Sequence, residues 1–273
     1  MNRIRSLSGK HSITFGLVIT SVFILMLIVS AVLGNLWPGD ETYGQPGGIL
    51  GRVISITILL VVLSQLGWLR SSGFISLGGW RTWLILILPL AYSIAVLAYA
   101  MTGKLDFRFS DSTLTGLVTL FILIAAFMEE IVFRGLILHG FVRVWGNTNR
   151  GSLKSILASS LLFCSIHLLD FLSGRPIFSV LLQSLEAFFL GVFLGALALN
   201  GKSIYPAVFF HGIMNLTTYL IFGSTGVEAA TSAWLLLSTL ILPLAIFGVY
   251  LLRTSYYPLA DKQITNNIRK TMY

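Results

Sequence analysis

Charged residues are scarce in this sequence. Asp, Glu, Lys and Arg make up 10% of the 273 residues, whereas hydrophobic residues make up 56%. A soluble domain cannot bury that much apolar surface, so the composition indicates a chain that crosses a membrane several times. The net charge of +8 does not point to nucleic acid, because the basic residues lie in short loops and tails, where they set membrane orientation. We expect a lipid bilayer as a partner and no nucleic acid.

Cysteine, repeats and low-complexity segments are also lacking. The single Cys164 lies within an apolar run, which excludes an intrachain disulfide. The first apolar run is longer than the core of a secretory signal and lacks a small-residue cleavage site. We therefore expect it to remain in the protein as a membrane helix.

Eight apolar runs predict an all-α polytopic membrane protein. About 20 apolar residues span a bilayer as a helix. The predicted spans are, in chain order, 13–33, 49–69, 83–101, 115–144, 155–172, 177–199, 204–222 and 230–252. The end of the fourth span, 135–145, is expected to kink or to run along the membrane interface. Basic residues concentrate in both tails and in every second loop, which predicts cytoplasmic termini.

The chain divides by function into three parts. Residues 1–114 would supply three N-terminal helices, 115–222 a catalytic core, and 223–273 the last helix and a cytoplasmic tail. We expect an integral protein of a prokaryotic plasma (inner) membrane.

One stretch of the fourth span carries three ionisable groups within six residues: Glu129, Glu130 and Arg134. Each such group costs about 3 kcal/mol near the centre of a bilayer, so each needs a partner inside the protein. Glu130 and Arg134 are four residues apart and share a helix face, which allows them to pair. Glu129 is rotated by about 100° from Glu130 and needs a partner on another helix.

Candidate partners lie in two other spans. His167 belongs to the fifth span, and His211 and Asn215 lie four apart in the seventh, so that the latter two face the same side. Polar side chains in a bilayer face the protein interior. We expect a conical polar cavity formed by spans four, five and seven. Taken singly, these features also fit an ion pair that stabilises a transporter bundle, or a histidine that only makes an interhelical hydrogen bond.

Together the three motifs resemble the signature of the CPBP family. The motifs are Glu-Glu-xxx-Arg at 129–134, Phe-xxx-His at 163–167 and His-xxx-Asn at 211–215. This family comprises the type II CAAX prenyl proteases and their bacteriocin-processing and abortive-infection relatives. The resemblance covers residues 115 to 222 and implies an intramembrane endopeptidase that cleaves a membrane-associated peptide or a lipidated or membrane protein.

The resemblance also implies roles for the site residues. Glu129 would be the general base that activates water, and His167 would help to hold that water. His211 and Asn215 would donate hydrogen bonds to the oxyanion. Glu130, Arg134 and Phe163 would lie next to these catalytic groups and hold them in position.

A zinc site is the competing chemistry. Glu129, His167 and His211 supply one carboxylate and two imidazoles, which is the ligand set of several catalytic zinc sites. The sequence has no His-Glu-xx-His helix, and the three ligands come from separate spans. We therefore favour a glutamate mechanism with no metal and no other cofactor.

Other interpretations remain for the whole chain and for the sixth span. The first alternative is a catalytically idle relative that acts as an immunity or scaffold protein, and the intact motifs argue against it. A proton-coupled transporter would also use intramembrane Glu and His, but no matching broken helices suggest one. In the sixth span, Glu186 either lines the cavity or pairs with a neighbouring helix, and Gly191 and Gly195 form a small-residue face for close helix packing.

Overall fold

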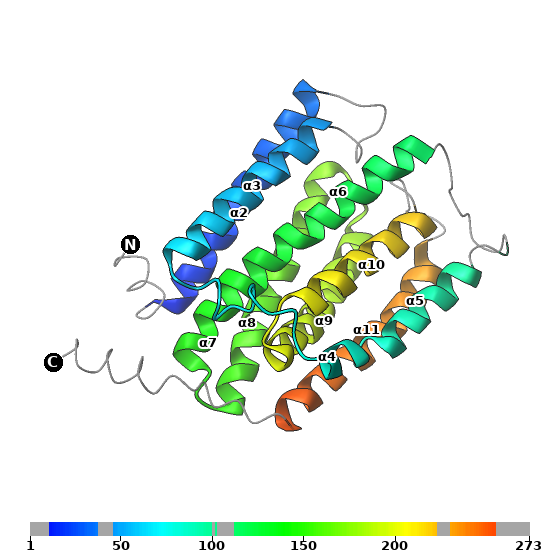
Figure 1. Cartoon of the computed structure of the whole chain (residues 1–273). Coiled ribbons are helices and arrows are strands. Elements are labelled where there is room, and N and C mark those ends of the chain that lie inside the picture. Colours follow the sequence, from blue (N-terminus) through cyan, green and yellow to red (C-terminus); the bar gives the residue numbers. More distant parts are fainter. Residues whose placement is uncertain (1–10, 38–45, 100–101, 103–111, 223–229, 255–273) are drawn as a thin grey trace.

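The computed structural model describes residues 11–37, 46–99, 102, 112–222 and 230–254. Within these residues the protein is helical and contains no strand, which confirms the all-α prediction. The helices lie side by side in a bundle, with α2 (Ser12–Leu36) and α3 (Pro46–Gln65) at one edge (Figure 1). α5 (Ile87–Tyr99) and α11 (Ala230–Thr254) lie at the opposite edge.

Each predicted span coincides with one helix or with a run of consecutive helices. Besides the four helices above, the elements are α4 (Trp80–Leu84), α6 (Ser112–Glu130), η2 (Ile131–Leu138), α7 (His139–Trp145), α8 (Asn149–His167), η3 (Leu168–Ser173), α9 (Ile177–Gly201) and α10 (Tyr205–Phe222). Six segments are long and apolar enough to cross a membrane: 12–36, 46–65, 80–98, 116–145, 149–173 and 177–201. α11 contains a shorter apolar stretch, Thr239–Leu252. The count of eight spans stays a prediction.

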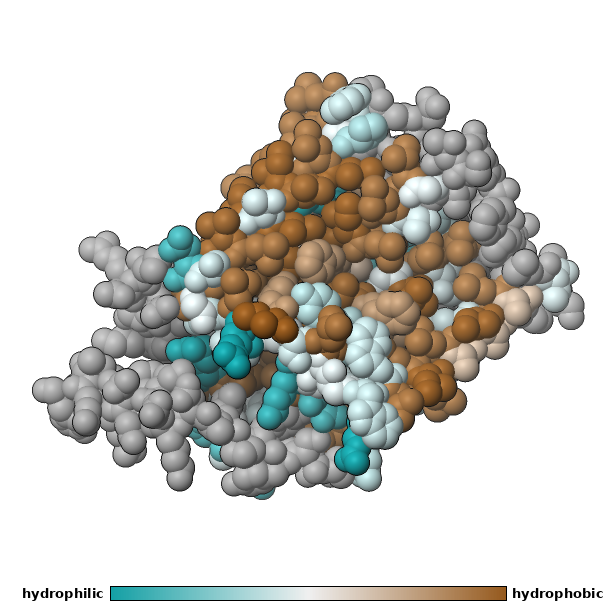
Figure 2. All heavy atoms as spheres, in the orientation of Figure 1, coloured by the Kyte–Doolittle hydropathy of each residue, from teal (hydrophilic) through white to brown (hydrophobic). Residues whose placement is uncertain are grey.

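The outer surface of the bundle is apolar. Large hydrophobic side chains such as Leu17, Val61 and Leu88 are 51%, 54% and 78% exposed, and apolar residues cover much of the face in Figure 2. Soluble monomers rarely expose apolar patches of more than a few hundred Å². Together with the apolar helices, this surface identifies an integral membrane protein. The tails 1–10 and 255–273, on which the orientation of the termini partly depends, lie outside the described residues.

Several helix boundaries differ from the sequence prediction, and two of these differences have a clear local cause. α3 ends at Gln65 rather than at residue 69, because Gly67 adopts a positive φ of 66° and turns the chain. The following Trp68 is buried edge-on against Phe15. α8 begins at Asn149 rather than at 155, because the Thr148 hydroxyl caps it by accepting a hydrogen bond from the amide of Gly151.

Residues 135–145 were expected to kink or to run along the membrane interface. The burial of residues 135–142 does not fit a course along the interface, while the kink stays a prediction. All eight residues of η2 are buried in the core, and α7 continues it with His139 to Val142 also buried. η2 is a π-helix, in which amides bond to carbonyls five residues earlier; the amide of His139, for example, bonds to the carbonyl of Arg134. The Ser159 hydroxyl on α8 donates to the carbonyl of Phe133, at 2.8 Å. This side chain ties the widened helix to its neighbour.

Close packing of α8 against α9 fixes the position of the helix that carries Phe163 and His167. A Cβ added at Gly191 would lie 3.0 Å from the Cβ of Ser160, and one at Gly195 would lie 3.3 Å from Ile156. The small-residue face predicted for the sixth span is therefore an interhelical contact. It brings α9 within reach of the side chains that α8 presents.

We expect Gly191→Val to lower the thermal unfolding midpoint of the protein in lipid nanodiscs, because the new side chain would push α8 and α9 apart. Overpacking of this kind costs about 1–3 kcal/mol. Gly116→Val is the matched control, since a Cβ at Gly116 meets no atom within 4 Å. Equal midpoints for the two variants would contradict the close packing.

Candidate active site

The ion pair between Glu130 and Arg134 is present and fully enclosed. Arg134 Nη1 lies 2.7 Å from Glu130 Oε1, and the two side chains are 2% and 0% exposed. Arg134 also donates from Nη2 to the carbonyl of Gly191 on α9, at 3.3 Å, and its guanidinium lies 4.8 Å from the ring centre of Phe163 on α8. The pairing predicted from the four-residue spacing is confirmed, and partners from two other helices complete it.

His211 on α10 lies between the two adjacent carboxylates. Its Nδ1 is 2.8 Å from Glu130 Oε1, and its Nε2 is 3.6 Å from Glu129 Oε2. Glu130 Oε1 already accepts a hydrogen bond from Arg134, so it acts as an acceptor towards His211 as well. The Nδ1 of His211 must therefore carry a proton. In the neutral ring, Nε2 then has a free lone pair, and it donates only when the ring is doubly protonated.

The two glutamates differ in their access to water. The Glu129 side chain is 15% exposed, whereas that of Glu130 is fully buried. Glu129 Oε2 makes no hydrogen bond within the described part of the chain, and its distance to His211 exceeds hydrogen-bond range. Arg52 on α3 is a further cation whose charge acts on Glu129. Glu130 Oε2 is likewise buried and without a hydrogen bond in the described part of the chain, so the two carboxylates differ in the ion pair of Glu130 and in the partial exposure of the Glu129 side chain.

Phe163 is the aromatic centre of the site. Its ring makes edge contacts with His167 and His211, with centroids 5.2 and 5.6 Å apart. It also contacts Phe133 at 5.0 Å and lies beside the Arg134 guanidinium. Although the two histidines come from different depths of their helices by sequence, both pack on this one ring.

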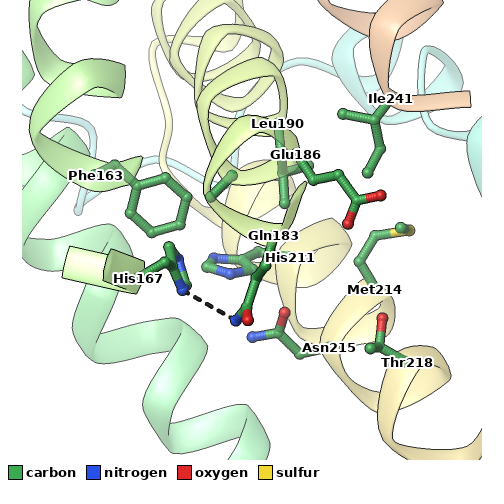
Figure 3. A pocket seen from close by; sticks show the side chains of 11 residues that line it. Phe163, His167, Gln183, Glu186, Leu190, His211, Met214, Asn215, Thr218 and Ile241 are labelled. Carbon is green, nitrogen blue, oxygen red and sulfur yellow. Dashed lines mark hydrogen bonds between the residues drawn. The ribbon is translucent and has the colours of Figure 1, made fainter. Parts of the chain in front are cut away.

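His167 makes its hydrogen bond through Nδ1. The Nε2 amide nitrogen of Gln183 on α9 lies 3.3 Å from this atom (Figure 3). The Nε2 of His167 is buried and has no partner among the residues that the structure describes. The ring therefore reaches the site with one nitrogen held and the other available.

A pocket of about 100 Å³, lined by both polar and apolar side chains, lies next to these groups. Its lining comes from α8, α9, α10 and α11 (Figure 3) and consists of Phe163, His167, Gln183, Glu186, Ala187, Leu190, His211, Met214, Asn215, Thr218 and Ile241. Four predicted site residues, Phe163, His167, His211 and Asn215, thus meet in one place.

The pocket differs in composition from the predicted conical cavity of spans four, five and seven. Neither Glu129 nor Glu130 of span four is among its lining residues, while spans six and eight contribute to it. The physical reason is that the imidazole of His211 bonds to Glu130 and approaches Glu129, so span four reaches the pocket through this ring. A cavity formed directly by span four stays a prediction.

Sequence reasoning missed Gln183, Thr218 and Arg52 and left Glu186 undecided. Glu186 lines the pocket, and its buried Oε1 has no hydrogen-bond partner among the described residues. Gln183 and Glu186 lie three apart in an otherwise apolar helix, which places them on one face. That spacing was the available signal for both.

The structure provides no ready cluster of metal ligands. No group of three or more His, Cys, Asp or Glu side chains within the described ranges is arranged to hold a metal ion. The alternative zinc set of Glu129, His167 and His211 does not come together as one such group. His167 instead bonds to Gln183, and His211 bonds to Glu130. Both rings contact Phe163.

Comparison with known families places this site in a recognised domain. A family model described as Type II CAAX prenyl endopeptidase Rce1-like matches residues 111–217. This part of the chain is similar to an Rce1-like domain. The match confirms the resemblance to the CPBP family and supports a membrane-embedded endopeptidase. No curated protein and no solved structure matched the chain.

The Rce1-like match contains all seven predicted site residues, from Glu129 to Asn215. Arg52, Thr218 and Ile241 lie outside it. The helices that flank the domain therefore add an arginine near Glu129 and part of the pocket wall.

The buried ion pair makes a stability prediction. Arg134→Met should lower stability by about 3–5 kcal/mol, because it leaves the Glu130 carboxylate without its cation inside the bundle. The double variant Glu130→Gln/Arg134→Met should recover much of this loss, since no unpaired charge is then buried. Thermal unfolding in nanodiscs measures both. A double variant as unstable as the single variant would contradict charge pairing as the cause.

Proposed function

We propose that the protein is an intramembrane endopeptidase in which Glu129 activates a water molecule for attack on a peptide bond. The observation that carries the proposal is the position of His211, which links the two adjacent glutamates to a pocket shared with His167 and Asn215. The Rce1-like match at 111–217 supports the same reaction class.

We assign the role of base to Glu129 because its side chain is partly exposed, whereas that of Glu130 is fully buried and paired with Arg134. Its carboxylate takes a proton from water, and the resulting hydroxide oxygen bonds to the carbonyl carbon of the substrate. The same proton then passes to the amide nitrogen as the carbon–nitrogen bond breaks. The products are a carboxylic acid and an amine, and transfer of the remaining proton from the acid to the amine gives a carboxylate and an ammonium group. General base catalysis of this kind contributes about 10²–10⁴ in rate.

Asn215 and His211 stabilise the oxyanion. Asn215 lines the pocket four residues from His211 on the same helix, and its side-chain amide is an N–H donor. His211 joins it from Nε2 in the doubly protonated form of the ring, because Nδ1 is held by Glu130. Glu130 and Arg134 keep this ring in place, and Phe163 packs against it.

The size of the pocket limits what enters it. About 100 Å³ is well below the 300–1,000 Å³ of typical small-molecule sites. The pocket therefore receives the scissile peptide unit and a small neighbouring group, while the rest of a membrane-associated peptide or protein lies along the bundle. Leu190, Met214 and Ile241 make one side of the pocket apolar.

Glu129→Gln should abolish cleavage, with a loss of at least about 10²-fold, because the amide cannot accept the proton of water. The assay uses a panel of lipidated and transmembrane peptides with the protein in liposomes. Glu186→Gln is the matched control, a second buried glutamate of the site that we assign no proton transfer. Equal cleavage by the wild type and Glu129→Gln would contradict the assignment of the base.

Asn215→Ala should reduce kcat by about 10²–10³-fold, the usual effect of losing one oxyanion donor. KM should change little, since the donor acts chiefly in the transition state. A variant that raises KM and keeps kcat would instead show that Asn215 only binds substrate.

The glutamate mechanism also predicts the metal dependence. Purified protein should hold less than stoichiometric zinc, and chelators should leave cleavage unchanged. Elemental analysis and assays before and after chelation test this. Loss of bound zinc together with activity, and recovery of both on adding zinc, would favour the metal mechanism.

A further inference from the structure

A line of polar contacts connects the site to the turn between α8 and α9. Asp170 Oδ2 lies 2.7 Å from Arg175 Nη1, and the same Nη1 lies 2.6 Å from Gln183 Oε1. The other end of the Gln183 amide, Nε2, lies 3.3 Å from His167 Nδ1 (Figure 3). Three residues outside the three sequence motifs thus lead to one imidazole within them.

The guanidinium of Arg175 fixes the direction of the hydrogen bonds along this line. A guanidinium donates hydrogen bonds and never accepts them, so the atom of Gln183 that it contacts must be the carbonyl oxygen. The amide nitrogen of Gln183 then faces His167 and donates. Its acceptor is His167 Nδ1, which must carry a lone pair. In the neutral ring the proton consequently lies on Nε2.

We propose that Gln183, oriented by Arg175, is a positioning residue that holds His167 as an Nε2–H donor in the active site. The Nε2 atom is buried and without a partner in the described chain, and the ring lines the pocket. His167 therefore offers a hydrogen to the reacting oxygen atoms and does not act as a base. This consequence for catalysis rests on the proposed endopeptidase function, whereas the tautomer does not.

The two imidazoles of the site are thereby set in opposite senses. Glu130 accepts from Nδ1 of His211, while Gln183 donates to Nδ1 of His167. In their neutral forms, Nε2 of His211 has a lone pair and Nε2 of His167 has a hydrogen. The two rings, packed on the same Phe163, can thus both donate from Nε2, but His167 does so as a neutral ring and His211 only when it is doubly protonated.

The members of the line differ in expected importance. Gln183 touches His167 directly, and Arg175 alone sets its amide orientation. Asp170 and Arg175 are 37% and 31% exposed, so their ion pair by itself contributes little. Loss of Asp170 should therefore have the smallest effect of the three.

The test is the tautomer of His167, measured by nitrogen-15 NMR of histidine-labelled protein in nanodiscs and assigned with His167→Gln. The wild type should carry its proton on Nε2. Gln183→Glu should move it to Nδ1, because a carboxylate in that place accepts. Gln183→Met, which is similar in size but makes no hydrogen bond, and Arg175→Met, which frees the amide to turn, should each give a mixture. Gln65→Glu, at an exposed position, is the control.

A wild-type proton on Nδ1, or a Gln183→Glu spectrum identical to the wild type, would overturn the proposal. Cleavage provides the second readout. Gln183→Glu should lose about 10²-fold or more, as for a lost donor to the reacting oxygen, and Gln183→Met less. A moved proton with unchanged cleavage would refute the positioning role. If the wild type cleaves no peptide, the proposed function fails, yet the NMR result still decides whether Gln183 sets the tautomer.

Discussion

The structure depends on the cost of enclosing charge within an apolar bundle. An isolated carboxylate or guanidinium in such surroundings is strongly unfavourable, and removing one partner of a buried pair leaves the other uncompensated. Glu130 and Arg134 meet this constraint together, but only with help from the Gly191 carbonyl, the face of Phe163 and the imidazole of His211. These contacts come from α8, α9 and α10. The helices of the site are thus brought together by the partners that one ion pair requires.

Glu129 takes no part in the Glu130–Arg134 ion pair. The two glutamates have the same chemistry and differ in their position on the helix. Adjacent residues on a helix point in different directions. Glu130 therefore faces Arg134, whereas the side chain of Glu129 points elsewhere and is partly exposed. The ring of Phe163 lies among the polar groups of the site, in contact with His167, His211 and the Arg134 guanidinium. An apolar ring in the middle of a polar site keeps two histidines and an arginine apart while holding all three in place.

The sequence allowed the parts of this arrangement that depend on local periodicity to be predicted. Helical runs, the Glu130–Arg134 pair and the shared face of His211 and Asn215 all follow from spacing along one segment. The contact of Gln183 with His167 lies between two helices that a turn connects, and no periodic pattern in the sequence predicts it. The same is true of Arg52, whose approach to Glu129 depends on how α3 packs. That α9 and α11 line the pocket also depended on packing, as did the burial of η2 and of the start of α7.

The π-helix from Ile131 to Leu138 has a consequence for the long helix that contains it. A wider turn places α6 and α7 out of phase, as though one residue had been inserted between them. The glutamates at the end of α6 can therefore face the site while the residues of α7 face a different set of neighbours, which a uniform α-helix of this sequence would not permit. In a relative that lacked one residue of this segment, α6 and α7 would be in phase, so the two helices could not both keep the faces that they present here.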